Sequence, residues 1–229
     1  MEQSGVKVLV LDVGGTHVKV RASGRAGVVK LDTGPTFTPP MLVSAVREAT
    51  ARWRFDAISI GVPAPVRHGE IVREPVNLGD GWVGFDFAAA FEGPVRVVND
   101  AVMQALGSYN GGRMLFLGLG TGLGTALVDN GQAVGLELGH LPYRKGTYED
   151  YVGDAARERM GRKRWERHVH TIATLMYDAL VCESMVLGGG NARLLHALPP
   201  HARLGSNADA FPGGLRLWER PGSPADPQG

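Results

Sequence analysis

The sequence contains a single cysteine, Cys182, among its 229 residues. One thiol excludes an internal disulfide framework and any zinc site built from several cysteines. Cys182 ends the apolar stretch 179–182, and free cysteines in such surroundings behave as small hydrophobic residues. We therefore expect a buried structural thiol rather than a reactive one.

Strong net charge, long apolar runs and a targeting segment are also missing. The 24 Lys and Arg residues nearly balance the 23 Asp and Glu residues, so the chain lacks the basic excess that holds nucleic acid. The longest apolar run, residues 115–128, is interrupted by glycines and too short to span a bilayer. Residues 1–5 do not resemble a signal peptide. We expect a cytoplasmic globular protein with neither membrane nor nucleic acid as a partner.

Glycine, in contrast, is abundant. The chain has 33 glycines, about twice the share of roughly 7% that is usual in proteins. Glycine lets the backbone turn tightly or come close to a ligand. Three glycine-rich turns follow apolar stretches directly: Gly14-Gly15-Thr16, residues 118–122 and residues 188–191.

Hydrophobic periodicity predicts a chain that alternates strands and helices. The strands are expected at 6–12, 17–22, 26–32, 56–60, 94–98, 113–119, 123–129 and 184–187. The helices are expected at 41–53, 85–92, 100–109, 191–197 and 207–218, with two more within 149–181. The first three strands should form an antiparallel meander. The same strand–turn–strand pattern restarts at residue 113, which predicts two related α/β domains with a cleft between them.

The restart also suggests where the domains divide. We place the N-terminal domain at residues 1–107 and the C-terminal domain at 108–206. The helix at 207–218 is expected to join the N-terminal domain. The polar, proline-containing tail at 219–229 is expected to be disordered.

The three glycine-rich turns have the composition of phosphate-binding loops. Paired glycines let backbone N–H groups point into a cavity, Thr16 adds a hydroxyl donor, and Asp12 at a strand end can hold Mg²⁺ directly or through water. No turn has the Gly-Lys-Ser/Thr sequence of a P-loop or the context of a dinucleotide-binding turn. More strand follows Gly122, so a hairpin rather than a helix N-terminus would hold the phosphates.

The order of several motifs resembles that of the ROK sugar kinases (repressor, open reading frame, kinase) of the actin-like ATPase superfamily. These motifs are Asp12-Val-Gly-Gly-Thr16, Asn77-Leu-Gly-Asp-Gly-Trp82, Asn99-Asp100-Ala101, Gly118-Leu-Gly-Thr-Gly122, Glu137-Leu-Gly-His140 and Gly188-Gly-Gly190. Residues 137–143, 149–153 and 161–165 most resemble the polyphosphate glucokinase branch. The resemblance implies an α/β fold of two actin-like (ribonuclease H-like) domains around an active-site cleft. It also implies Mg²⁺-dependent transfer of a phosphoryl group from polyphosphate, ATP or both to the 6-hydroxyl of glucose.

The resemblance further implies a role for individual residues. Asp100 would be the general base, and Asp12 would position Mg²⁺. Sugar hydroxyls would be held by Asn77, Asn99, Asp100, Glu137, His140 and Glu149. Donor phosphates would be held by Gly14, Gly15, Thr16, Lys19, Gly120, Thr121 and Gly122, and a nucleotide by Gly188, Gly189, Gly190 and Asn191. Two of these residues have simpler interpretations, because Asp100 could cap the following helix and Asn77 could form an Asx turn.

One departure from the family changes the expected metal content. Most members follow the histidine equivalent to His140 with cysteines that bind a structural zinc, whereas residues 141–148 contain no cysteine. We therefore predict no zinc. The shortened loop also leaves the family's last sugar-binding carboxylate at either Glu149 or Asp150.

The sequence leaves open the role of a basic segment and the class of protein. The cations of this segment are Arg157, Arg159, Arg162, Lys163, Arg164 and Arg167. They could form a solvated helix face or line a path for a polyanionic donor. The alternatives to a glucokinase are an ATP-dependent kinase for another hexose or an N-acetylhexosamine, a catalytically silent sugar-binding protein, and a repressor. We expect no DNA-binding domain before the strand at Val6, and a homodimer as is common in the family.

Overall fold

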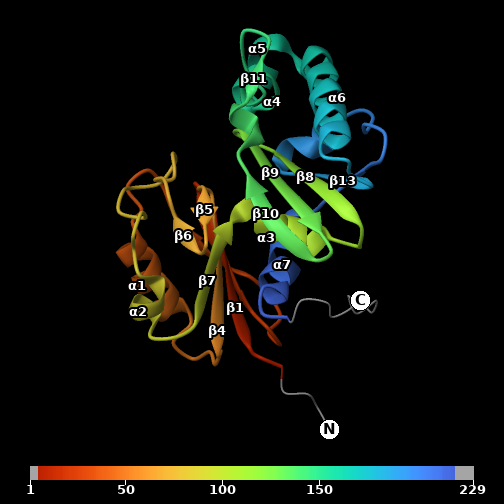
Figure 1. The fold of residues 1–229 in the computed structure, drawn as a ribbon. Coiled ribbons are helices and arrows are strands. Elements are labelled where there is room, and N and C mark those ends of the chain that lie inside the picture. Colours follow the sequence, from red (N-terminus) through yellow and green to blue (C-terminus); the bar gives the residue numbers. More distant parts are fainter. Residues whose placement is uncertain (1–4, 220–229) are drawn as a thin grey trace.

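The computed structural model describes residues 5–219, which form two α/β lobes with one mixed five-stranded sheet each (Figure 1). The first sheet has the order β3-β2-β1-β4-β7. Its strands are β1 (Val8–Val13), β2 (His17–Ala22), β3 (Val29–Asp32), β4 (Ala57–Val62) and β7 (Val95–Asn99). β1, β2 and β3 form an antiparallel meander, as predicted, and β4 and β7 add parallel to β1.

The second sheet repeats this arrangement, with the order β10-β9-β8-β13-β14. Its strands are β8 (Arg113–Leu119), β9 (Leu123–Asp129), β10 (Gln132–Leu136), β13 (Ser184–Gly188) and β14 (Ala202–Leu204). β8, β9 and β10 are antiparallel, and β13 and β14 run parallel to β8. The predicted α/β fold is confirmed. Each sheet turns sharply between its first two strands, so the two glycine turns occupy equivalent places.

Helices cover the sheets and fill the space between them. They are α1 (Pro39–Ala49), α2 (Phe87–Phe91), α3 (Asp100–Ser108), α4 (Glu149–Val152), α5 (Asp154–Met160), α6 (Arg162–Ala179) and α7 (Ala210–Arg216). Apolar residues of α1 and α2 pack on the first sheet, and those of α6 pack on the second. The interior strand β4, between β1 and β7, is buried along its whole length, as expected for parallel strands covered on both faces.

The last helix returns to the start of the chain. In Figure 1 α7 lies beside β1, and it also contacts α3. Two glycines permit this contact, because a Cβ atom at Gly107 would overlap the carbonyl oxygen of Asp209 and one at Gly213 would overlap that of Met103. Gly107 lies in the last turn of α3 and allows this close approach of the two segments.

Several predicted elements were wrong in type or extent. The segment 149–181 holds three helices rather than two, because Gly153 and Gly161 interrupt it. The helix expected at 191–197 is a short 3₁₀ helix, η2 (Gly190–Leu194), and 207–218 divides into η3 (Asn207–Asp209) and α7. The short strands β5 (Val66–Arg67), β6 (Glu70–Ile71), β11 (Pro142–Tyr143) and β12 (Gly146–Thr147) were not predicted, nor were β10 and β14. Apart from Glu219, the tail expected at 219–229 lies outside the described residues.

Candidate active site

A pocket of about 480 Å³ is lined by both glycine turns and by side chains of both lobes. Its wall includes most of the predicted site residues: Gly14, Gly15, Asn77, Asn99, Asp100, Gly120, Thr121, Gly122, Glu137, His140, Glu149 and Gly189. Gly15 lies against Asn77, since a Cβ atom there would be 3.2 Å from the Asn77 Cβ atom. The predicted sugar residues and both predicted phosphate turns therefore share one cavity.

The first turn is held from behind by Thr33. The Thr33 hydroxyl donates to the Gly14 carbonyl at 2.8 Å, and the Thr33 N–H donates to the Thr16 carbonyl at 2.9 Å. The Gly14 N–H is bonded to the His17 carbonyl, but the N–H groups of Gly15 and Thr16 have no bonding partner among residues 5–219. With the Gly14 and Thr16 carbonyls bound, the turn keeps two N–H donors for a ligand.

Asp12 and Lys19 form an ion pair beside this turn. They face each other on the antiparallel strands β1 and β2, and the Lys19 Nζ atom lies 2.9 Å from Asp12 Oδ2. Neither residue belongs to the pocket wall, and neither does Thr16. Lys19 thus offsets the charge of Asp12 in the absence of a ligand.

Asn99 caps α3 and leaves the Asp100 carboxyl facing the pocket. The Asn99 Oδ1 atom accepts from the Ala101 N–H at 2.9 Å, and its amide donates to the Ala64 carbonyl at 3.1 Å. Asp100 is the first helical residue, and its Oδ1 atom accepts from the same Ala101 N–H. The alternative in which Asp100 is the cap is therefore wrong: the cap residue is Asn99.

The environment of Asp100 favours its neutral form. Burial and the nearby negative charge of Asp12 raise the pKa of Asp100 to about 7, with a smaller contribution from Glu137. A hydrogen bond from Ala101 opposes this increase. A carboxyl group with a pKa near the working pH is suited to proton transfer.

The opposite wall carries three further polar side chains. Glu137 precedes the 3₁₀ helix η1 (Leu138–His140), and its Oε2 atom lies 3.2 Å from His140 Nε2, so the two side chains share one face as predicted. Glu149 begins α4, and its Oε2 atom accepts from the Leu123 N–H at 3.0 Å. Asp150 instead accepts two bonds from Thr147 and does not line the pocket.

An aromatic cluster supports this wall. It consists of Tyr143, Tyr148, Tyr151 and His168, whose neighbouring rings have centroids 4.9–5.9 Å apart. The Tyr143 hydroxyl also lies 3.2 Å from His168 Nδ1, and burial lowers the pKa of His168. The cluster packs the cysteine-free loop between His140 and Glu149 against α6.

The third glycine turn serves close packing. A Cβ atom at Gly188 would lie 2.5 Å from the Phe116 ring, and one at Gly189, where φ is +78°, would overlap the Leu119 backbone. Gly189 reaches the pocket wall, whereas Gly188, Gly190 and Asn191 do not. Asn191 is buried and bonded to Asp154.

Several residues of the pocket wall were not predicted, among them Arg73, Glu74, Val76 and Gln104. Glu74 is occupied by the N–H groups of Trp82 and Val83, while Gln104 Oε1 is buried and has no partner among the described residues. Gln104 follows Asp100 by four residues on α3, so helical spacing could have identified it. The other three lie on a loop without a recognisable motif.

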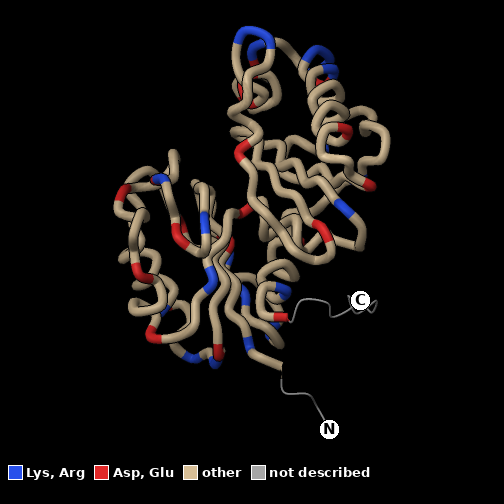
Figure 2. The backbone as a smooth tube through the Cα atoms, viewed as in Figure 1, with Lys and Arg blue, Asp and Glu red and all other residues tan. Residues whose placement is uncertain are grey.

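A second pocket, of about 790 Å³, lies between α6 and the segment after η2. Its wall consists of Arg162, Lys163, Glu166, Arg167, His170, Thr171, His196 and Ala197. Figure 2 shows basic residues at the start of α6. Other cations of the segment are engaged elsewhere, since Arg157 pairs with Asp154 and Arg159 donates to the Asp150 carbonyl.

Residues 5–219 contain no cluster of three or more His, Cys, Asp or Glu side chains that could hold a metal ion. None of their helices combines the length and apolar character needed to span a membrane.

The sequence model of the ROK family matches residues 8–149, which include both phosphate turns and the Asn99-Asp100 pair. The chain belongs to the ROK family. It is 28% identical to the polyphosphate glucokinase of Mycobacterium tuberculosis, over 80% of this chain and 77% of that protein. It is 30% identical to a glucokinase of Pyrobaculum calidifontis, over 65% of this chain and 58% of that protein.

Solved structures agree on the fold of this ROK protein. An inorganic polyphosphate/ATP-glucomannokinase from Arthrobacter sp. superposes with a TM-score of 0.77 at 22% identity, covering 92% of this chain and 97% of the other. A ROK glucokinase from Streptomyces griseus, solved with glucose and AMPPNP, gives 0.72 at 18% identity, covering 93% and 99%. These neighbours support the two-lobed actin-like architecture.

Proposed function

We propose that this protein is a sugar kinase that transfers a phosphoryl group from polyphosphate or ATP to the 6-hydroxyl of glucose. One observation carries the proposal: a single pocket holds a carboxyl group whose pKa is raised to about 7 and two turns with free backbone N–H donors. The carboxyl group can accept a hydroxyl proton and the turns can bind phosphate oxygens, which are the two requirements of phosphoryl transfer.

In the proposed reaction Asp100 acts as the general base. Its carboxylate accepts the proton of the sugar hydroxyl as that oxygen forms a bond to the terminal phosphorus of the donor. The bond from phosphorus to the bridging oxygen breaks, and the shortened donor leaves with those electrons. Asn99 orients Asp100 by capping α3, whose first residue is Asp100.

The sugar would lie against Asn77, Glu137, His140 and Glu149. The Glu137–His140 pair offers an acceptor and a donor 3.2 Å apart, a spacing that suits two adjacent sugar hydroxyls. One oxygen of Glu149 is bonded to the Leu123 N–H, which leaves the other for the sugar. Because Asp150 is bonded to Thr147 and outside the pocket wall, we assign this role to Glu149.

The donor phosphates would bind the N–H groups of Gly15, Thr16, Thr121 and Gly122. A magnesium ion would fit beside them, since Mg²⁺ in kinases is usually held by one or two carboxylates, waters and substrate phosphates. Asp12 would supply the carboxylate, because only one of its oxygens is engaged by Lys19. When bound, the ion neutralises donor charge.

The donor is proposed to be polyphosphate, ATP or both. The similarity to polyphosphate glucokinases favours polyphosphate, and the cations of the α6 pocket, Arg162, Lys163 and Arg167, suit a polyanion with many phosphates. A direct test compares the wild type with the triple variant Arg162→Gln/Lys163→Gln/Arg167→Gln. The KM for polyphosphate should rise at least about tenfold while the KM for ATP changes little. Each lost ionic contact weakens the binding of a polyanion, and the losses add up.

A matched control removes the same charge elsewhere. The variant Lys30→Gln/Arg52→Gln/Arg54→Gln changes three exposed cations of the first lobe and should leave both KM values unchanged. Equal effects of the two triple variants would mean that only net charge matters, and the α6 pocket would then have no role in donor binding.

The kinase proposal itself is tested with a coupled assay for sugar 6-phosphate. Glucose, mannose and N-acetylmannosamine are each supplied with ATP or with polyphosphate, in the presence of Mg²⁺. Glucose should give the highest kcat/KM. A higher value for another sugar would correct the substrate, and no product with any pair would overturn the kinase function in favour of a silent sugar-binding protein.

A further inference from the structure

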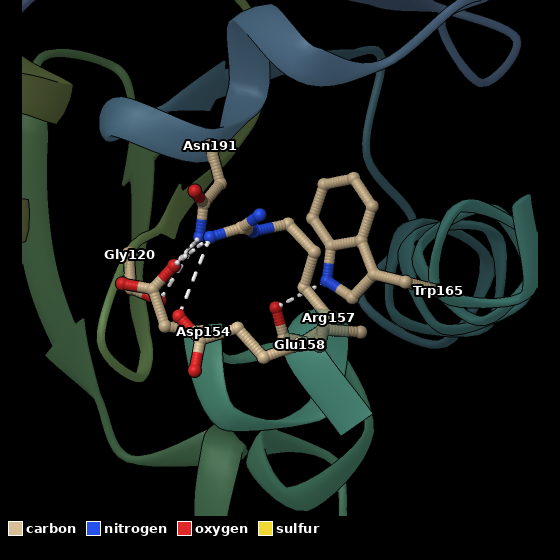
Figure 3. Close-up of polar contacts among 7 residues, drawn as sticks. Gly120, Asp154, Arg157, Glu158, Trp165 and Asn191 are labelled. Atoms are coloured by element: carbon tan, nitrogen blue, oxygen red, sulfur yellow. Dashed lines mark hydrogen bonds and ion pairs between the residues drawn. The ribbon is translucent and has the colours of Figure 1, made fainter. Parts of the chain in front are cut away.

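Three polar side chains distant from the second phosphate turn in the sequence, Asp154, Arg157 and Asn191, form a hydrogen-bonded group beside it, and Asn191 bonds the turn directly (Figure 3). The Asn191 amide donates to Asp154 Oδ1 at 2.8 Å and to the Gly120 carbonyl at 3.3 Å. The Arg157 guanidinium donates to the same Asp154 oxygen at 3.1 Å. The Asp154 carboxylate therefore joins two donors through one oxygen.

The backbone of Asp154 binds the turn itself. Its N–H group donates to the Gly120 carbonyl at 3.0 Å and approaches the Thr121 carbonyl at 3.3 Å. The preceding residue must be glycine, because a Cβ atom at Gly153 would lie 2.6 Å from the Thr121 carbonyl oxygen. The start of α5 is thus pressed against the carbonyl side of the turn.

Binding of the carbonyls decides where the N–H groups point. In a tight turn the two ends of a peptide unit face opposite ways, since the unit is planar. The N–H groups of Thr121 and Gly122 have no bonding partner within residues 5–219, and both residues line the pocket. Holding Gly120 and Thr121 from behind therefore aims two donors at the cavity.

Binding of an anionic donor also requires that a carboxylate near the turn be neutralised. A carboxylate close to a phosphate turn would repel an anionic donor unless it is paired. Asp154 is paired on one oxygen by both Arg157 and Asn191, and Asn191 has a relative exposure of only 7%. A buried amide bonded to a carboxylate and a turn carbonyl suits positioning better than contact with a nucleotide.

We infer that Asp154 and Asn191 are positioning residues for the phosphoryl donor, and that Arg157 keeps Asp154 compatible with an anion. The inference rests on the proposed kinase function, since it concerns the donor side of that site. It replaces the expected nucleotide contact of Asn191 with an indirect role that applies to polyphosphate and ATP alike.

The test uses Asn191→Asp, a variant of almost unchanged size that sets a second carboxylate at hydrogen-bond distance from Asp154. The KM for either donor should rise at least about tenfold, because a favourable buried bond becomes a repulsion between like charges. The affinity for glucose, measured by calorimetry without donor, should stay within about twofold, because Asn191 is bonded to Gly120 and Asp154 and not to a proposed sugar-binding side chain. Asn191→Ala should raise the donor KM by a smaller factor.

Two further variants separate positioning from stability. Glu158→Gln is the control, since Glu158 is exposed, lies 3.9 Å from Arg157 and does not touch the turn; its donor KM should match the wild type. The double variant Asp154→Asn/Asn191→Asp returns one amide and one carboxylate to the pair with positions exchanged. It should recover part of the lost donor affinity relative to Asn191→Asp.

The outcomes distinguish the inference from the proposed function. A folded Asn191→Asp variant with a wild-type donor KM would overturn the inference, as would equal losses of glucose and donor affinity that follow the melting temperature. Direct binding of tripolyphosphate by calorimetry gives a second readout. Tripolyphosphate affinity lost in Asn191→Asp would support the inference even if the wild type transfers no phosphate, and a folded Asn191→Asp variant that binds tripolyphosphate as tightly as the wild type does would overturn the inference and leave the kinase proposal intact.

Discussion

The two phosphate turns occupy equivalent places in equivalent sheets, yet they are held in different ways. Thr33 holds the first turn through two neutral hydrogen bonds. Asp154 holds the second, with Arg157 and Asn191 bonded to its carboxylate. The repeated fold thus specifies where a phosphate turn lies, while the residues behind each turn differ.

The charges beside the turns differ as well. Next to the first turn lie Asp12 and Asp100, and their mutual repulsion contributes to the raised pKa of Asp100. Next to the second turn, Glu149 and Asp154 each accept hydrogen bonds through one carboxylate oxygen. The first side is therefore suited to proton transfer and the second to holding the donor, a division that mutation can test.

The largest expected effect is that of Asp100→Asn on the first side. Loss of the general base should lower kcat by about 10²–10⁴-fold, while glucose affinity measured by calorimetry changes much less. A variant with a nearly normal kcat would exclude Asp100 as the base. The coupled assay at saturating sugar and donor measures this directly.

The pH dependence of the melting temperature of the same variant serves as its control. When folding raises the pKa of a carboxyl group, the folded protein loses stability as the pH rises from about 4, where the carboxyl group of the unfolded chain ionises, to about 7. The asparagine side chain of the variant does not ionise, so Asp100→Asn should melt at a higher temperature than the wild type above pH 7 and gain little at pH 4. A gain independent of pH would contradict the raised pKa.

The next largest effect is expected from Gly122→Ala on the second side. The added methyl group would overlap the Glu149 carboxylate, which must then give up its bond to the Leu123 N–H. Because Glu149 is also a proposed sugar ligand, both KM values should rise, and kcat/KM should fall by about 10²-fold, the typical cost of a displacement near 1 Å. Gly93→Ala, which adds a methyl group in open space, should have no effect.

A smaller effect distinguishes the two acids of the first side. Because the pKa of Asp100 is raised to about 7, kcat/KM for the sugar should rise with pH and level off above about pH 7. Asp12→Asn removes the like charge, so the midpoint of this profile should move to lower pH even if the rate is reduced. An unchanged midpoint would mean that burial alone raises the pKa.

The smallest expected effect is that of Thr33→Val on the first turn. It removes the 2.8 Å bond to the Gly14 carbonyl with little change in volume, and the backbone bond to Thr16 remains. One neutral hydrogen bond is worth about 1 kcal/mol, so the donor KM should rise only a few-fold. An effect larger than that of Asn191→Ala would reverse the comparison between the two turns.

Much of the fold followed from local patterns. Apolar stretches ending in glycines predicted the strands and the turns after them, because each signal lies within a few residues. Asn99-Asp100 at a strand end likewise identified the start of α3. Two helices were predicted within 149–181, so one of the two breaks, at Gly153 and Gly161, was missed.

Other parts of the site depended on distant contacts. Asn191 lies 37 residues from Asp154 and 71 from Gly120, so no local pattern could assign it to the second turn. The choice between Glu149 and Asp150 likewise depended on which carboxylate the short hairpin β11–β12 binds.

The sequence by itself determined the α/β class, the position of both phosphate turns and the residues beside them, because these depend on neighbouring residues. Tertiary structure alone decided which of those residues share a pocket, which are occupied in supporting others, and how far the pKa of Asp100 rises. These properties depend on burial and on charges brought together from both halves of the chain, and such long-range contacts exist only once the chain has folded.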